Sequence, residues 1–158
     1  MSATDNMVEF DRTLLGVRKA MDRFPMVIKA EEIMRYSTVL GETYSCYFDE
    51  KTAKLAGFRG VLAPPAFSTA LTIGMGKPDV GLKGVGASFL ATEAVHRFGP
   101  ICAGDTLGAN FYLKNVYRKT GRSGSMVFVV WAIEFTNQMG DLIETTEKSY
   151  VYKGAREQ

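Results

Sequence analysis

The chain has 158 residues, 46% of them hydrophobic, and a formal net charge of +2. This length and composition suit one domain with a single core, and the near-balanced charge gives no indication of nucleic acid or an anionic membrane as partner. The polar first dozen residues do not resemble a secretory signal, and the longest apolar run, residues 127–133, falls well short of the about 20 residues of a membrane helix. A cytoplasmic protein is expected. Its two cysteines, Cys46 and Cys102, are expected to be reduced and lack the spacing of a metal site.

The start of the chain is interpreted as a leader. Apolar residues recur at helical spacing over 12–24, and Pro25 ends the pattern. Residues 1–23 are therefore predicted to form a leader with a short helix, ahead of a single domain over 24–154 and a tail over 155–158.

Two further helices are expected in the first third of the domain, after a short strand over 26–30. Residues 30–41 predict an amphipathic helix that ends at Gly41. Residues 48–58 predict a second, shorter helix, also closed by a glycine. The residues expected to face inward from the first of these helices are Ile33, Met34, Val39 and Leu40.

Residues 63–78 predict a buried helix of about three turns. Two prolines stand at its entry, Pro78 stands at its exit, and almost every residue between them is small or apolar. A helix with almost no polar face belongs inside another layer of structure.

The second half of the chain changes to a strand pattern. Four runs rich in β-branched and aromatic residues cover 86–98, 105–118, 123–137 and 142–154. Turn signals at 120–124 and 137–141 predict that the last three runs pair antiparallel. Helices followed by consecutive strands indicate an α+β fold, a curled antiparallel sheet wrapped around the central apolar helix.

Two stretches carry a resemblance to a known family. FRGVLAPPAF, residues 58–67, and HRFGPICAGDTL, residues 96–107, resemble the MaoC-like hydratases and dehydratases, in particular their hydroxyacyl-thioester dehydratase N-terminal-domain branch. The resemblance implies a hot-dog fold and a function on acyl thioesters in fatty acid metabolism. It also implies coenzyme A or an acyl carrier protein as substrate carrier, no other cofactor, and no metal.

The resemblance also implies where the chemistry would lie. Active members use an Asp–His pair on a short loop and a backbone N–H of a glycine at the central helix entry, which binds the thioester oxygen. In this chain those positions fall on Glu42, Tyr47 and Pro65. A phenol is a poor base at neutral pH, and proline has no N–H, although Ala66 has one nearby. Glu42 and Tyr47 are the candidate catalytic residues.

The remaining candidates contact the substrate. Pro65, Ala66 and Phe67 are expected beside the thioester carbonyl, and His96, the chain's only histidine, is expected at the rim of the site. A packed aromatic at Tyr47, a solvated Glu42 and a structural His96 are the alternatives.

Three functions stay open at this point. The first is an acyl-thioester-binding subunit of a (R)-3-hydroxyacyl-thioester dehydratase or enoyl-thioester hydratase, completed by a catalytic hot-dog partner. The second is a self-sufficient hydro-lyase that uses Glu42 and Tyr47, or His96. The third is a non-catalytic acyl-CoA-binding homodimer. Under each of these three functions the protein is expected to form a homo-oligomer or a heterodimer, because a single hot-dog sheet leaves an open edge.

Overall fold

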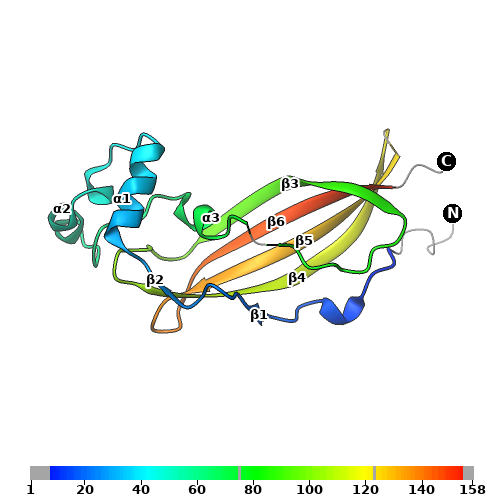
Figure 1. The fold of residues 1–158 in the computed structure, drawn as a ribbon, viewed down its shortest axis with the longest axis horizontal. Coiled ribbons are helices and arrows are strands. Elements are labelled where there is room, and N and C mark those ends of the chain that lie inside the picture. Colours follow the sequence, from blue (N-terminus) through cyan, green and yellow to red (C-terminus); the bar gives the residue numbers. More distant parts are fainter. Residues whose placement is uncertain (1–7, 75, 123, 155–158) are drawn as a thin grey trace.

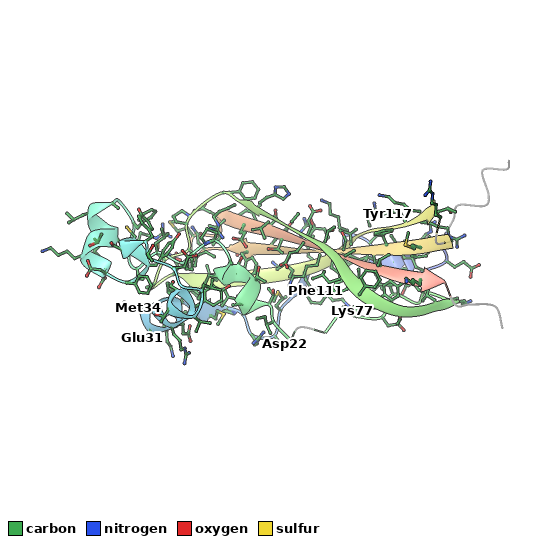
Figure 2. All side chains as sticks on the ribbon, turned by 90° about the horizontal axis from the view of Figure 1, so that it is seen from above. Asp22, Glu31, Met34, Lys77, Phe111 and Tyr117 are labelled. Atoms are coloured by element: carbon green, nitrogen blue, oxygen red, sulfur yellow. The ribbon has the colours of Figure 1, made fainter. Side chains whose placement is uncertain are left out.

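The computed structural model describes residues 8–74, 76–122 and 124–154. A long, curled antiparallel sheet forms most of the molecule, and helices α1 and α2 gather at one end of it (Figure 1). Seen from above, Met34 and Glu31 of α1 lie at that end, and Tyr117 lies near the other (Figure 2). This confirms the predicted hot-dog architecture.

The four long strands follow the sequence prediction closely. They are β3 (Val85–Arg97), β4 (Thr106–Gly121), β5 (Gly124–Thr136) and β6 (Leu142–Gly154). Two hairpins join β4 to β5 and β5 to β6, and β3 pairs antiparallel with β6. The sheet order is β1-β4-β5-β6-β3, so β3 forms one edge of the sheet. The predicted antiparallel pairing of the last three strands is confirmed.

The leader is mostly extended, so the helical spacing over 12–24 was misleading. Within its described residues, 8–23, only Arg12–Leu14 forms a helical turn, of 3-10 type. The chain then runs along β4 as β1 (Lys19–Ala20), and the Gly16 N–H donates to the Leu113 carbonyl oxygen at 2.9 Å. Pairing with the sheet satisfies the backbone that a helix would otherwise satisfy. The predicted short strand is β2 (Met26–Val27), which also pairs with β4.

Helix α1 (Ala30–Val39) and helix α2 (Glu50–Leu55) lie where the sequence predicts them. Ile33 is buried and Met34 is partly buried, as expected, but Val39 and Leu40 are exposed. The inward prediction for those two residues was wrong, because the buried face of α1 runs through Ile33 and Ser37 and Val39 lies outside it. A 3-10 turn, Ser45–Tyr47, separates the two helices.

The central helix is much shorter than predicted. Helix α3 covers only Phe67–Leu71, against the three turns expected over 63–78. Gly74 follows in a left-handed conformation, with a φ of 77°, which a continuing helix does not allow. Arg23 of the leader donates to the carbonyl oxygens of Leu71 and Ile73 at 3.1 and 2.8 Å, and these bonds replace the next helical turn.

Two apolar clusters line one side of the sheet, called here the inner face. The larger cluster joins Phe67 of α3 and Ile33 of α1 to Ile133 and Phe135 of β5. The smaller cluster, around Trp131, lies farther along the sheet, beyond the end of α3. The inner face is therefore covered by helices at one end and by extended chain at the other.

Candidate functional site

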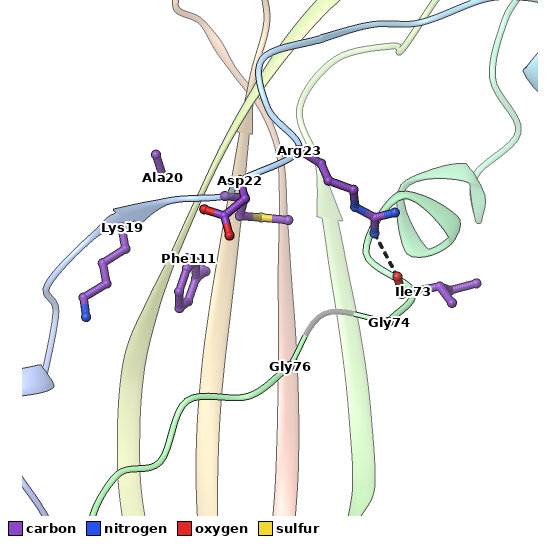
Figure 3. A pocket seen from close by; sticks show the side chains of 9 residues that line it. Lys19, Ala20, Asp22, Arg23, Ile73, Gly74, Gly76 and Phe111 are labelled. Atoms are coloured by element: carbon purple, nitrogen blue, oxygen red, sulfur yellow. Dashed lines mark hydrogen bonds between the residues drawn. The ribbon is translucent and has the colours of Figure 1, made fainter.

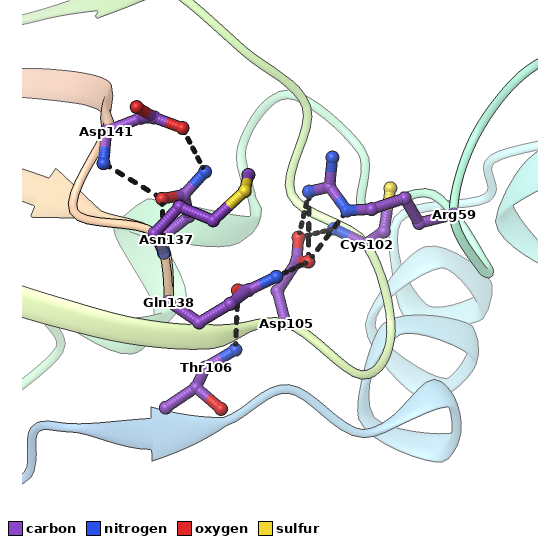
Figure 4. Close-up of polar contacts among 8 residues, drawn as sticks. Arg59, Cys102, Asp105, Thr106, Asn137, Gln138 and Asp141 are labelled. Carbon is purple, nitrogen blue, oxygen red and sulfur yellow. Dashed lines mark hydrogen bonds and ion pairs between the residues drawn. The ribbon is translucent and has the colours of Figure 1, made fainter.

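The two stretches that carry the family resemblance are joined by a buried ion pair. The guanidinium of Arg59, in the first stretch, donates three hydrogen bonds of 2.8–3.1 Å to the carboxylate of Asp105, in the second (Figure 4). Asp105 is 3% exposed and also accepts from the Cys102 N–H at 2.9 Å. This pair fixes the loop that leads into the central helix.

Close backbone approach holds the same loop. Leu62 forms an antiparallel bridge with Cys102, and the Ala103 N–H donates to the Val61 carbonyl oxygen at 2.8 Å. A Cβ on Gly60 would lie 2.6 Å from the Ala103 carbonyl oxygen, so only glycine fits there. The glycine of this motif therefore has a structural role.

Glu42 and Tyr47 lie on the loop between α1 and α2, and both are partly buried. Tyr47 packs edge to face on Tyr44, with ring centroids 5.1 Å apart. The next acid along, Asp49, caps α2 by accepting from the Thr52 N–H at 2.6 Å. Glu42 is therefore the carboxylate of this loop that is left for chemistry.

The pKa of Tyr47 is raised above the usual value of a phenol. Burial is the main cause, and the negative charge of Glu42 adds to it, while the positive charge of Arg97 acts in the opposite direction. Glu42 also raises the pKa of Tyr36, after burial. Both phenols therefore stay protonated at neutral pH and can donate a proton or a hydrogen bond but cannot accept a proton as a base.

The turn at residues 64–66 lies beside these groups. Tyr36 donates from its hydroxyl to the Ala66 carbonyl oxygen at 2.8 Å, and Arg97 donates to the Pro65 carbonyl oxygen. Pro65 and Ala66 are exposed, and Phe67 is buried. Within the described part of the chain the Ala66 N–H has no acceptor, so it is the backbone donor that this turn offers.

Arg97 and Glu144 were missed by the sequence analysis. Glu144 is fully buried on the inner face, and its Oε2 accepts from Nε and Nη2 of Arg97 at 3.1 and 2.9 Å. A glutamate in register with the core residue Phe135 was the available signal. A buried ion pair beside an exposed turn marks a candidate functional position.

His96 is not brought together with the other candidates. It precedes Arg97 in a regular part of β3, so its side chain projects from the opposite face of the sheet. Arg97 reaches the turn at 64–66 from the inner face, and His96 is exposed on the other side. Its place at the rim of the site stays a prediction.

A groove runs from the end of α3 along the inner face. Its largest compartment has a volume of about 600 Å³ and lies between the leader and residues Ile73, Gly74 and Gly76, with Phe111 as its floor (Figure 3). Two smaller compartments, of about 50 and 100 Å³, also contain Phe111 and extend to Trp131. The groove lies beside residues 72–74 and 76–78, which follow α3 in the chain.

The groove and the candidate catalytic loop do not coincide. A separate pocket of about 410 Å³ lies between α1 and α3 and includes Tyr36, Phe67 and Arg23. Arg23 also lines the largest compartment of the groove, so these two cavities meet at one side chain. Glu42, whose charge raises the pKa of Tyr36, and Tyr47 line neither of these two cavities.

The described residues include no group of three or more side chains that could hold a metal ion. Within the same ranges, no helix is long and apolar enough to cross a membrane.

The comparisons agree with this architecture. The family model for the FAS1-like dehydratase domain region matches residues 14–146. A UPF0336 protein of Parafrankia sp. (strain EAN1pec) is 31% identical over 136 residues, covering 82% of this chain and 86% of the relative.

Solved structures show the same fold. A complex described as HadBC, a 3R-hydroxyacyl-ACP dehydratase from Mycobacterium tuberculosis, superposes with a TM-score of 0.68 at 18% identity, covering 87% of this chain and 96% of the other. A MaoC-like dehydratase from Rhodospirillum rubrum superposes with a TM-score of 0.62 at 18% identity, covering 91% and 94%.

The curled antiparallel sheet with its short central helix defines the class as the hot-dog proteins. The chain belongs, within that class, to the FAS1-like dehydratase domain region family, and the predicted resemblance to MaoC-like proteins is confirmed.

Proposed function

We propose that the chain is the acyl-thioester-binding subunit of a (R)-3-hydroxyacyl-thioester dehydratase or enoyl-thioester hydratase. It lacks the usual Asp–His pair, and a catalytic hot-dog partner supplies that chemistry. The thioester carbonyl lies near Pro65 and Ala66, and the acyl chain follows the inner-face groove.

One observation supports the missing chemistry most directly. The loop of Glu42 and Tyr47 has no group that can act as a base of the histidine type, because the pKa of Tyr47 is raised. The chain's only histidine, His96, projects from the other face of the sheet. Active members of the family move these protons with an Asp–His pair, and this loop offers a carboxylate and a protonated phenol instead, which supports a partner that supplies the histidine.

The groove supports the acyl-binding part of the proposal. Ligand sites are concave and mostly apolar, with a few polar groups that fix orientation. Phe111, Trp131 and Ile133 supply the apolar wall, and Lys148 and Tyr150 stand at one side of it. An alkyl chain that covers the partly buried Phe111 would displace water from apolar surface, which is the expected source of affinity.

The exposed edge of the sheet supports the proposal that a second hot-dog chain binds this one. β3 pairs with β6 on one side, and on its other side no described strand covers its 13 residues. Exposed apolar residues along and just beyond it include Phe89 and Phe98, which are 53% and 63% exposed. A long apolar edge of this kind is normally covered by another chain, and the HadBC structure is a complex of two such proteins.

Binding and turnover by the pure protein test the proposal together. Octanoyl-CoA is expected to change the fluorescence of Trp131, the chain's only tryptophan, as it enters the groove. trans-2-Octenoyl-CoA is expected to keep its enoyl absorbance, because the loop carries no histidine to activate the water. If the parent protein hydrates this substrate and Glu42→Gln does not, the proposal that the chain depends on a catalytic partner is refuted. The chain would then be a self-sufficient hydro-lyase.

A groove-blocking variant shows whether the ligand occupies this groove. Gly76 lines two compartments, and a Cβ built on it meets nothing within 4 Å. Gly76→Leu should therefore fill the groove without strain and weaken octanoyl-CoA binding at least about 10-fold, or 1.4 kcal/mol. Gly121→Leu makes the same change on the exposed β4–β5 hairpin and should leave binding unchanged. Equal effects of the two variants would place the ligand elsewhere.

Light scattering separates the subunit from a stand-alone binding protein. A pure chain that stays monomeric, or forms a weak dimer that exchanges for a second hot-dog chain, fits the subunit. A tight homodimer that binds octanoyl-CoA and does not exchange a subunit for a second hot-dog chain would favour the non-catalytic acyl-CoA-binding homodimer.

A further inference from the structure

Arg97 stands at the end of β3, where the sheet meets the turn at residues 64–66. Its Nε and Nη2 both donate to Oε2 of Glu144, and Nη2 also donates to the carbonyl oxygen of Pro65. Three of its five N–H donors are therefore committed to a carboxylate and to the turn at which the thioester is expected.

The partner of Arg97 is unusually buried. Glu144 is 0% exposed, and its other oxygen accepts from the Thr146 hydroxyl at 3.3 Å. A carboxylate with no access to water requires a fixed cation, since leaving it unpaired is strongly unfavourable. Glu144 thus holds the guanidinium of Arg97 in one orientation, from the interior of the protein.

That orientation leaves one nitrogen unused. Because Nε and Nη2 form the edge that faces Glu144, the two N–H groups of Nη1 project from the opposite side of the planar guanidinium. No residue that the structure describes accepts from Nη1, and the side chain of Arg97 is 30% exposed. The positive charge also reaches the candidate loop, where it acts to lower the pKa of Tyr47.

We propose that Arg97 binds substrate by donating a hydrogen bond from Nη1 to the thioester carbonyl oxygen. It thereby replaces the backbone N–H that Pro65 does not have. The inference rests on the proposed function, since it requires that the carbonyl lie beside the turn at 64–66. A charged donor is stronger than a neutral amide, and one held by a buried carboxylate is organised before the substrate arrives.

A purely structural role makes a different prediction. If Arg97 only holds the turn through Pro65, its loss weakens every ligand of the groove alike. If Arg97 binds the carbonyl, its loss weakens only ligands that have one. Two ligands that differ in this single group therefore separate the two roles.

Octanoyl-CoA and S-octyl-CoA form such a pair, because the second carries a methylene in place of the carbonyl. The parent protein is expected to bind octanoyl-CoA about 10-fold or more tightly than S-octyl-CoA, as a hydrogen bond to a charged group predicts. Arg97→Lys keeps a cation beside Glu144 but loses the Nη1 fork. Arg97→Lys should therefore weaken the binding of octanoyl-CoA alone, so that the affinities for octanoyl-CoA and S-octyl-CoA become similar.

Two further variants test whether a loss of discrimination between the two ligands comes from misfolding. The double variant Arg97→Gln with Glu144→Gln removes both buried charges and should also lose the discrimination. Arg18→Lys changes an arginine that pairs with Glu134, away from the turn, and should keep it. Thermal melts of all variants check that each one is folded.

The carbon-13 signal of [1-¹³C]octanoyl-CoA gives an independent readout. The carbonyl resonance should move downfield on binding to the parent protein and move less on binding to Arg97→Lys. Equal weakening of both ligands in Arg97→Lys, with the carbonyl shift unchanged, would overturn the role of Arg97 and leave the proposed function intact. Failure of the parent protein to bind either ligand would overturn both.

Discussion

Replacing Arg59 by methionine tests whether the ion pair with Asp105 holds the loop that leads to the central helix. Asp105 is 3% exposed and would retain the Cys102 N–H at 2.9 Å and a longer contact from Gln138 at 3.4 Å. Removing one partner of a buried ion pair costs about 3–5 kcal/mol. Because the Arg59 side chain is 45% exposed, water can reach that side of the pair, so we expect the low end, about 3 kcal/mol.

The reverse change should cost less. Asp105→Asn keeps an acceptor for the Cys102 N–H and leaves Arg59 free to turn into solvent, so about 1–2 kcal/mol is expected. The double variant should resemble Asp105→Asn alone, which corresponds to a coupling energy of about 3 kcal/mol between the two positions.

Urea unfolding at one fixed protein concentration measures all three variants. For a chain of this size, 3 kcal/mol lowers the Tm by about 6–12 °C. Additive effects of the two single changes, or a cost below about 1 kcal/mol for Arg59→Met, would refute the role assigned to this ion pair.

Two more predictions concern stability. Gly60→Ala should destabilise by about 1–3 kcal/mol in urea, because its Cβ would lie 2.6 Å from the Ala103 carbonyl oxygen. Gly86→Ala is the matched control, because a Cβ on Gly86 would lie 3.7 Å from its nearest neighbour, the Lys153 carbonyl oxygen. Equal losses of unfolding free energy in the two variants would contradict the steric reason. Arg18 lowers the pKa of Glu134 from its ordinary 4.5, so this pair stabilises the fold above about pH 4.5 and progressively less as the pH falls below it. The Tm difference between the parent protein and Arg18→Gln should therefore shrink in acid; a difference independent of pH would contradict the assignment.

The sheet was predictable from sequence because its signals are local. Alternating β-branched and aromatic residues mark β3 to β6, and glycine-containing turns separate the last three strands. The central helix was not, since small and apolar residues suit a buried helix and a buried extended segment equally well. Its end is set by Gly74 and by Arg23, which comes from a segment about 50 residues earlier in the chain.

The candidate site divides in the same way. Glu42, Tyr47 and Pro65 could be proposed from sequence because they stand at fixed places beside recognisable local patterns, and their roles stay predictions. Arg97 and Glu144 are 47 residues apart, and only the register between β3 and β6 brings them together. No spacing rule along the chain anticipates such a pair.

The motif residues show how the fold can be kept independently of the activity. Gly60 and Asp105 serve the loop, one through close backbone approach and the other through its ion pair with Arg59. Such residues are required wherever this loop is built, whether or not a reaction takes place beside it. The family resemblance implies that other positions decide the reaction: those of Glu42, Tyr47 and Pro65, where active members carry the aspartate, the histidine and the glycine. A glutamate, a protonated phenol and a proline at those positions are what a chain would carry if it binds the thioester and leaves proton transfer to its partner.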